Sequence, residues 1–393
     1  MKPWALIASA TFSATLLCGC ASQSPVQLMP PAQLFDDKLF QPPSAPVDID
    51  SVFAVSDAMR VYVQREIGIG QPGKDIRRTL FNALYRKDKL KLDYDSAMTR
   101  NAAQTFEARA GNCLSLAIMT AALARELNLE VQFQQIEVEE SWSRAGGLYF
   151  ASNHVSLTLG RSTMTSAFGV EMAASLTVDF IPIPPKVREN AKPLQQHTIV
   201  AMYLNNRAAE FLAAGAIDDA YWSARKAIEQ DPAFLNAYNT LGVIYQHHGD
   251  RAAAERSVRH ALTLAPNNTI FMANLAQTLE SEGKNQEANE LRARLAQLEP
   301  YPPFHFFNLG QDAMKLGDYM RARNLFQREL ERAPDYHEFH FWLALADYNL
   351  GNLREADAHM AKALENSTTR GDHDLYAAKL DRIRAYENHP QSK

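Results

Sequence analysis

The second half of the chain repeats one pattern of small, apolar and polar positions every 34 residues. Three residue types recur at this spacing: Pro232, Pro266, Pro300 and Pro334; Gly215, Gly249, Gly283, Gly317 and Gly351; and Ala220, Ala254, Ala288, Ala322 and Ala356. A pair of helices explains this order, because glycine ends the first helix, alanine lets the second approach it and proline stops the second. The pattern predicts five two-helix repeats over residues 201–365, followed by a capping helix over Asp374–Tyr386.

The first half of the chain lacks the 34-residue repeat and instead shows helical and alternating patterns of apolar residues. Apolar residues at three- and four-residue steps predict a helix that opens at Cys113: Leu116, Met119, Leu123 and Leu127. Alternating or apolar stretches then predict three strands: Glu130–Val138, Asn153–Leu159 and Leu176–Ile181. Two further helices are expected upstream, over Asp50–Gln64 and Asp75–Tyr85. The fold class is therefore α+β for residues 51–186, then a linker over residues 187–200, then an all-α solenoid over residues 201–386.

Three side chains that could act in catalysis occur in this α+β part, in the order thiol, imidazole and carboxylate. Cys113 lies at a helix start, where unpaired N–H groups and the helix dipole favour a thiolate. His154 shares a strand face with Ser156, opposite the apolar face, and Asp179 lies on the third strand. This order can set a thiol against an imidazole that a carboxylate orients. Taken singly, each residue can instead be structural: a buried small hydrophobe, a core histidine and a strand-end cap.

The segment around Cys113 resembles the transglutaminase-like fold, a rearranged relative of papain-type thiol enzymes. The resemblance is carried by Gly111-Asn112-Cys113, by the spacing of Thr99, Ala103, Phe106 and Arg109, and by the residues that follow His154. It implies that Cys113 is the nucleophile, His154 the general base and acid, and Asp179 the orienting group. It also implies an oxyanion donor upstream, for which Gln104 and Asn101 are the candidates. The chain departs from the family at Ser156, where many members have Trp, and at Phe180, where many have Pro.

The repeats resemble tetratricopeptide repeats. The second unit carries the motif best: Tyr238, Leu241-Gly242, Tyr245, Ala254, Ala261 and Pro266. The resemblance implies that the first helix of each repeat lines a concave groove for a protein or peptide. The implied lining is polar at one end and aromatic at the other: Met202, Asn205, Asn236, Asn239 and Gln246, then Phe304, Phe307, Phe341 and Tyr348. An aromatic groove suits an apolar or helical peptide. The alternative is that these rings pack on the capping helix or on the preceding domain.

The N-terminus has the pattern of a secretory signal. Lys2 precedes an apolar stretch over Trp4–Leu17, and residues 1–19 are expected to be removed. The sequence Leu17-Cys18-Gly19-Cys20 resembles a bacterial lipobox, which implies lipidation of Cys20, and Ala21 after it favours the outer membrane facing the periplasm. Residues 20–50, rich in Pro, Ser, Gln and Asp, are expected to form a tether. The alternative is an ordinary signal peptide or an uncleaved anchor.

Composition narrows the functional classes. The chain has 393 residues, 46% of them hydrophobic, three cysteines and a formal charge of −5. No basic field is present to bind nucleic acid, so we expect no nucleic-acid partner. The histidine pairs His247-His248 and His337/His340 lack acidic or cysteine partners, so no metal or other cofactor is expected. The sequence therefore indicates an envelope thiol enzyme that hydrolyses a peptide or amide bond through a Cys113 thioester. The alternative is a non-catalytic scaffold lipoprotein.

Overall fold

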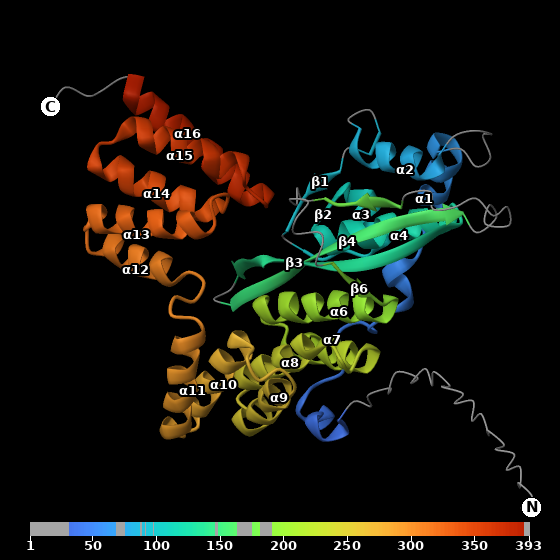
Figure 1. The fold of residues 1–393 in the computed structure, drawn as a ribbon, viewed down its shortest axis with the longest axis horizontal. Helices are drawn as coiled ribbons and strands as arrows, with labels where there is room; N and C mark the ends of the chain where they lie inside the picture. Colours follow the sequence, from blue (N-terminus) through green and yellow to red (C-terminus); the bar gives the residue numbers. More distant parts are fainter. Residues whose placement is uncertain are drawn as a thin grey trace, which may run out of the picture.

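The computed structural model describes residues 31–67, 75–86, 89–90, 92–96, 98–145, 148–162, 175–180 and 191–388. Its first part combines short helices with β-strands, and its second part is a curved row of paired helices (Figure 1). The predicted signal peptide and Cys20 lie outside the described residues. None of the described helices is long and apolar enough to cross a membrane.

The N-terminal unit surrounds one buried helix. Its helical elements are η1 (Ala32–Leu34), η2 (Asp37–Leu39), η3 (Asp50–Phe53), α1 (Asp57–Tyr62), η4 (Val63–Ile67), α2 (Ile76–Tyr85), α3 (Ala102–Ala108) and α4 (Cys113–Glu126). Every residue of α4 from Cys113 to Ala124 is buried. This burial follows from the sequence of α4, which is apolar or small nearly all round and so suits the interior of a domain.

The strands form two sheets. A short parallel pair joins β1 (Asp93–Tyr94) to β2 (Ala110–Gly111). An antiparallel sheet has the order β5-β4-β3-β6, with bounds Leu129–Ala145 for β3, Leu148–Ser162 for β4, Leu176–Val178 for β5 and Lys192–Leu194 for β6. In β4, Val155, Leu157 and Leu159 are fully buried on one face, which matches the predicted alternation. The sheet packs against α4, so its core face and the helix close one apolar layer.

The repeats follow the predicted 34-residue spacing. The helix pairs are α6 (Gln196–Ala213) with α7 (Ile217–Gln230), α8 (Leu235–His248) with α9 (Arg251–Leu264), α10 (Thr269–Ser281) with α11 (Asn285–Leu298), α12 (His305–Lys315) with α13 (Tyr319–Arg332), and α14 (His337–Leu350) with α15 (Leu353–Glu365). The five recurring glycines, Gly215 to Gly351, have φ values from 76° to 104°, a region that only glycine adopts easily. The five recurring alanines are fully buried. The reasons given for the glycines and the alanines of the repeat are therefore confirmed.

The boundaries of three predicted segments need correction. The linker over residues 187–200 is wrong at its end, because β6 pairs with β3 and α6 already begins at Gln196. The capping helix α16 runs over Arg370–Asn388 and so starts before the predicted Asp374. The upstream helix predicted over Asp50–Gln64 is split by residues 54–56 into η3 and α1.

The predicted tether is also wrong for residues 31–50, which pack on the first repeats. Phe40 is 5% exposed and stacks on Tyr221, with ring centroids 3.9 Å apart. The Tyr245 hydroxyl donates to the carbonyl of Leu34 at 2.9 Å. The tether is predicted from the prolines and polar residues of this segment. Two apolar residues among them, Leu34 and Phe40, pack against the repeat helices instead. We call residues 31–44 the strap.

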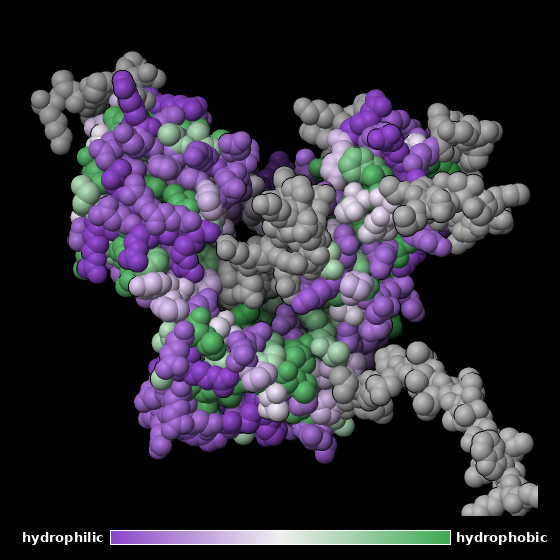
Figure 2. Space-filling view, viewed as in Figure 1, coloured by the Kyte–Doolittle hydropathy of each residue, from purple (hydrophilic) through white to green (hydrophobic). Residues whose placement is uncertain are grey.

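The solenoid has a break between α11 and α12. The core of the N-terminal unit is continuous with that of α6 to α11, whereas α12 to α16 are organised around two separate clusters. Pro300, Pro302 and Pro303 separate the two parts, and Phe304 adopts a left-handed φ of 62°. Apolar side chains stay exposed beside the break, including Leu298 at 48% and Tyr301 at 51%. Figure 2 shows α13 to α16 presenting a largely hydrophilic surface, with apolar side chains in separate patches.

Candidate functional site

Cys113 is the first residue of α4, and its position is fixed by the residue before it. Asn112 caps the helix: its Oδ1 accepts from the Ser115 backbone N–H and from the Ser115 hydroxyl, both at 2.9 Å. Gly111 is required here, because a Cβ at this position would lie 2.8 Å from Ser115 Cβ. The thiol therefore lies at a capped helix start, where backbone N–H groups of the first turn have no intrahelical partner. Cys113 itself is 9% exposed.

His154 and Asp179 reach this helix start from the sheet. His154 projects from β4, and Asp179 follows the last residue of β5. His154 Nε2 lies 2.6 Å from Asp179 Oδ1, and the two side chains are 3% and 4% exposed. Because a carboxylate only accepts, Nε2 carries the proton of this hydrogen bond. Since Nε2 is used by Asp179, Nδ1 is the nitrogen left for the thiol.

The electrostatics of His154 reflect both neighbours. Burial lowers the pKa of this imidazole, but hydrogen bonds to Asp179 and Cys113 and the negative charges of both groups outweigh that effect and raise the pKa to about 9. At neutral pH the histidine is therefore held as an imidazolium between two acceptors. A cation in this place is suited to pair with a thiolate.

The structure thus brings together the three residues singled out in the sequence: Cys113, His154 and Asp179. One detail of the prediction is wrong, because β5 ends at Val178 and Asp179 lies beyond it rather than within a strand. The role of each residue in a reaction stays a prediction.

Sequence reasoning missed a residue that holds Asp179. The Tyr85 hydroxyl, at the end of α2, donates to the backbone carbonyl of Asp179 at 2.6 Å. Its ring also stacks on Phe180, with centroids 5.7 Å apart and an interplanar angle of 25°. In the sequence, Phe180 is only a departure from the resemblance given above, in which proline is frequent at this position. The ring pair explains it, because it fixes the chain at the point where proline would restrict it.

A second missed residue, Tyr94, lies beside the thiol. It pairs in β1 with Gly111 of β2, and it keeps 38% of its surface exposed. Desolvation, together with negative charge at Cys113 and Asp95, raises the pKa of Tyr94. The only signal in the sequence was its place in a short stretch before the helix, which is too weak to single it out.

The two oxyanion candidates have a structural explanation. Asn101 and Gln104 form a reciprocal capping box at the start of α3, with Asn101 Oδ1 accepting from the Gln104 N–H at 2.9 Å and Gln104 Oε1 accepting from the Asn101 N–H at 3.2 Å. The geometry assigns both side chains to helix capping. An oxyanion role for either remains a prediction.

The aromatic end of the predicted groove is wrong. Phe304 and Phe307 are 2% and 0% exposed and belong to the core of the fourth and fifth repeats. Phe341 stacks on Tyr376 of α16, and Tyr348 meets Tyr386 of the same helix. The alternative, that these rings pack on the capping helix, is therefore the correct one for Phe341 and Tyr348. Aromatic residues at helical spacing served packing, which is their more frequent use.

The polar end of the groove keeps its amide side chains. Asn239 Oδ1 accepts from Asn274 Nδ2 at 2.8 Å, which links α8 to α10. Asn205 Oδ1, on α6, is buried and accepts no hydrogen bond from any residue that the structure describes. These amides could both donate to and accept from a peptide backbone.

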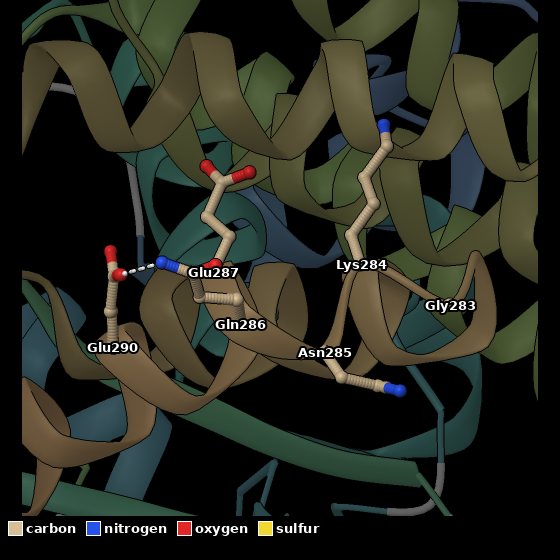
Figure 3. A pocket seen from close by; sticks show the side chains of 6 residues that line it. All are labelled: Gly283, Lys284, Asn285, Gln286, Glu287 and Glu290. Carbon is tan, nitrogen blue, oxygen red and sulfur yellow. Dashed lines mark hydrogen bonds between the residues drawn. The ribbon is translucent and has the colours of Figure 1, made fainter.

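Elsewhere, a shallow polar hollow lies at the start of α11, lined by Gly283, Lys284, Asn285, Gln286, Glu287 and Glu290 (Figure 3). Its charges are already paired: Lys284 Nζ lies 2.6 Å from Glu255, and Gln286 donates to Glu290. Within the described residues, no group of three or more His, Cys, Asp or Glu could hold a metal ion. The cluster at Cys113 is therefore the stronger candidate site.

Comparison with known proteins identifies the repeats. Residues 235–268 and 307–370 each match models of the tetratricopeptide repeat. The C-terminal half of the chain is thus a tetratricopeptide-repeat solenoid, the class that its period and glycine positions define.

Two curated relatives come from Pseudomonas aeruginosa. The TPR repeat-containing protein PA4667 is 25% identical over 150 residues, which is 38% of this chain and 25% of that protein. The type IV pilus assembly protein PilF is 26% identical over 122 residues, which is 30% of this chain and 48% of that protein. The chain therefore spans between a quarter and a half of the length of these relatives.

Solved structures are also similar to a part of the chain. That of P. aeruginosa PilF is 19% identical and covers 50% of this chain and 96% of that one, with a TM-score of 0.28. A thermophilic TPR protein of Thermus thermophilus is 20% identical and covers 46% of this chain and 98% of that one, with a TM-score of 0.30.

Proposed function

We propose that the protein is a scaffold for protein–protein interaction whose repeats bind an extended peptide segment of a partner. The observation that carries this proposal is the row of amides Asn205, Asn239 and Asn274 on the first helices of three consecutive repeats. Side-chain amides match the alternating donors and acceptors of a peptide backbone. Its likeness to a pilus assembly protein supports a partner that is itself a protein.

Photo-crosslinking tests this proposal. A crosslinking amino acid at position 239 should give one discrete protein adduct in cells of the source organism. The matched control carries the same amino acid at Glu290, an exposed residue of α11 outside the amide row. Adducts of equal yield at both positions, or none at position 239, would overturn the groove as the binding surface.

A second candidate function is acyl transfer by a transglutaminase-like thiol site, and the placement of His154 between Asp179 and Cys113 favours it. In this reaction the Cys113 sulfur forms a bond to an amide carbonyl carbon, and the His154 imidazolium gives its proton to the leaving amine as the C–N bond breaks. Water then attacks the thioester carbonyl carbon while neutral His154 takes its proton, and the C–S bond breaks to release the acid and restore the Cys113 thiolate. Backbone N–H groups at the start of α4, which have no intrahelical partner, would stabilise the oxyanion.

The rate of Cys113 alkylation between pH 5 and 9 separates an active thiol from an inert one. The protein should start at residue 21, because Cys113 is then its only cysteine. An active site predicts fast labelling near pH 6 that collapses in His154→Ala. Labelling that rises only near the ordinary thiol value of about 8.5, with no effect of the substitution, would leave the scaffold function alone.

The location proposed for the protein is the periplasmic face of the outer membrane, through a lipid on Cys20. The support is the lipobox-like Leu17-Cys18-Gly19-Cys20 and Ala21 after it. Metabolic labelling with palmitate should mark the full-length protein and be lost in Cys20→Ser, whereas labelling that persists in the variant would overturn the anchor.

A further inference from the structure

The first repeat makes a direct polar contact with the cap of the Cys113 helix. Thr99, 2% exposed, lies between them. Its backbone N–H donates to Glu210 Oε1 of α6 at 2.6 Å, and its hydroxyl oxygen accepts from Asn112 Nδ2 at 2.9 Å and from Asn206 Nδ2 at 3.3 Å. One threonine therefore joins the repeat helix to the residue that caps α4.

The next residue closes the same network on the other side. The Arg100 backbone N–H donates to the Ser115 hydroxyl oxygen at 2.9 Å, and that hydroxyl donates to Asn112 Oδ1. Asn112 is thus held through both its amide nitrogen and its amide oxygen. Because Cys113 follows it directly, the orientation of Asn112 sets the direction in which the thiol leaves the helix start.

The other end of the solenoid reaches the same stretch of chain. The Ser96 backbone N–H donates to the Thr368 carbonyl at 3.0 Å, and the two hydroxyl groups are also 3.0 Å apart. Thr368 lies between α15 and α16, which Figure 1 places across from β1 and β2. Both ends of the solenoid therefore form hydrogen bonds to the stretch Ser96–Thr99.

We propose that Glu210 and Asn206 of the first repeat are positioning residues for Cys113, acting through Thr99 and Asn112. This inference rests on the thiol site proposed above. It makes the solenoid part of the site rather than a separate recruiting module, because the acceptor that holds Thr99 comes from a repeat helix. Thr368 supports the same stretch from the far end and has the smaller effect.

The test compares two repeat carboxylates with similar surroundings. Glu210 is 25% exposed and pairs with Arg207 three residues earlier, whereas Glu229 is 28% exposed and pairs with Arg225 and Lys226 on α7. Glu210→Ala should lower the rate of Cys113 alkylation at pH 6 roughly fivefold, the loss expected from weakening one helix cap. Glu229→Ala should leave that rate unchanged, and Glu210→Gln, which keeps an acceptor for the Thr99 N–H, should restore most of it.

Hydrogen exchange of the peptide that contains residues 112–116 gives a second readout. Exchange should quicken in Glu210→Ala and stay unchanged in Glu229→Ala. An activated thiol in the wild type, with alkylation and exchange both unaffected by Glu210→Ala, would overturn the positioning role alone. An ordinary thiol in the wild type, with exchange that still responds, would overturn the thiol site and leave the link between repeat and helix cap standing.

Discussion

Two buried histidines in different parts of the molecule have pKa values that are shifted in opposite directions. His154 in the N-terminal unit is 4% exposed, and His340 on α14 is 3% exposed. The pKa of His154 is raised to about 9, despite burial, by Asp179 and Cys113, whereas burial lowers the pKa of His340. Equal burial with opposite shifts shows that the partner of the ring, and not its depth, decides its charge.

The partners of His340 are neutral. Its Nε2 donates to the carbonyl of Pro334 at 2.8 Å, and its Nδ1 lies 3.1 Å from Nδ1 of His359. Burial lowers the pKa of both rings, so both are neutral at pH 7. With Nε2 of His340 protonated, its Nδ1 then accepts from Nδ1 of His359. The fifth repeat therefore has two neutral histidines in contact, whereas the N-terminal unit has one charged histidine paired with Asp179.

The largest effect is expected from Asp179→Asn. Burial lowers the pKa of His154, and without the carboxylate less remains to raise it, so this pKa should fall well below 9. A histidine raised from 6.5 to about 9 contributes on the order of 3 kcal/mol of stability, present in full below pH 6.5 and lost as the pH rises toward 9. Thermal unfolding at pH 6.5 and pH 9 should show this difference in the wild type and a much smaller one in the variant.

Asp250→Asn is the control for this substitution. Asp250 pairs with His248, and the two side chains are 34% and 28% exposed, respectively. The substitution removes the charge from this His–Asp contact. Since exposed pairs contribute little, we expect its unfolding to keep the pH response of the wild type. An equal loss of that response in both variants would show that the slope does not come from the site at Cys113.

A smaller effect, of opposite sign in pH, is expected at His359. Burial lowers the pKa of both His340 and His359 below 6.5, so the unfolded chain binds more protons and stability falls as the pH drops through the range below 6.5. His359→Gln should shrink the decrease in melting temperature between pH 7 and pH 5 by about 2–4 °C, as for a change of about 1 kcal/mol. His373→Gln, at a ring that is 58% exposed, is the control and should change little. An unaltered acid response in His359→Gln would place the sensitivity elsewhere.

Local sequence rules predicted the parts of the fold that repeat or alternate. The glycine, alanine and proline spacing located the helix pairs, and the alternation from Val155 to Leu159 put His154 on the correct strand face. These features depend on residues close together in the chain. The strap was missed because its anchors, Leu34 and Phe40, bind helices about 200 residues later, and nothing in their own neighbourhood marks them.

The candidate site shows the same limit. Cys113, His154 and Asp179 could be named from the order of helix and strands, but their supports could not. Tyr85 and Glu210 look like ordinary positions of amphipathic helices, and only the packing of α2 and α6 brings them to Asp179 and Thr99. The aromatic groove failed for a related reason. Helical spacing predicts that Phe304 and Phe307 share a face, but not whether a further helix covers it.

The smallest effect tests whether the charge of His154 depends on how firmly Asp179 is held. Tyr85→Phe removes the 2.6 Å hydrogen bond to the Asp179 carbonyl and keeps the ring that stacks on Phe180. One such bond contributes about 1 kcal/mol, so alkylation of Cys113 at pH 6 should slow by less than about tenfold and the pKa of His154 should fall slightly. Proton NMR of the His154 ring across the titration measures that shift directly.

Tyr62→Phe is the matched control for Tyr85→Phe. Its hydroxyl donates to the Ala83 carbonyl at a long 3.5 Å, in the same unit but not to Asp179. Both variants can lower the melting temperature slightly, but only Tyr85→Phe should move the His154 titration. A titration that is unchanged in Tyr85→Phe would mean that pairing of β5 with β4 alone fixes the carboxylate. The contrast with His340 would then depend on the charge of Asp179 and not on how closely the protein controls its position.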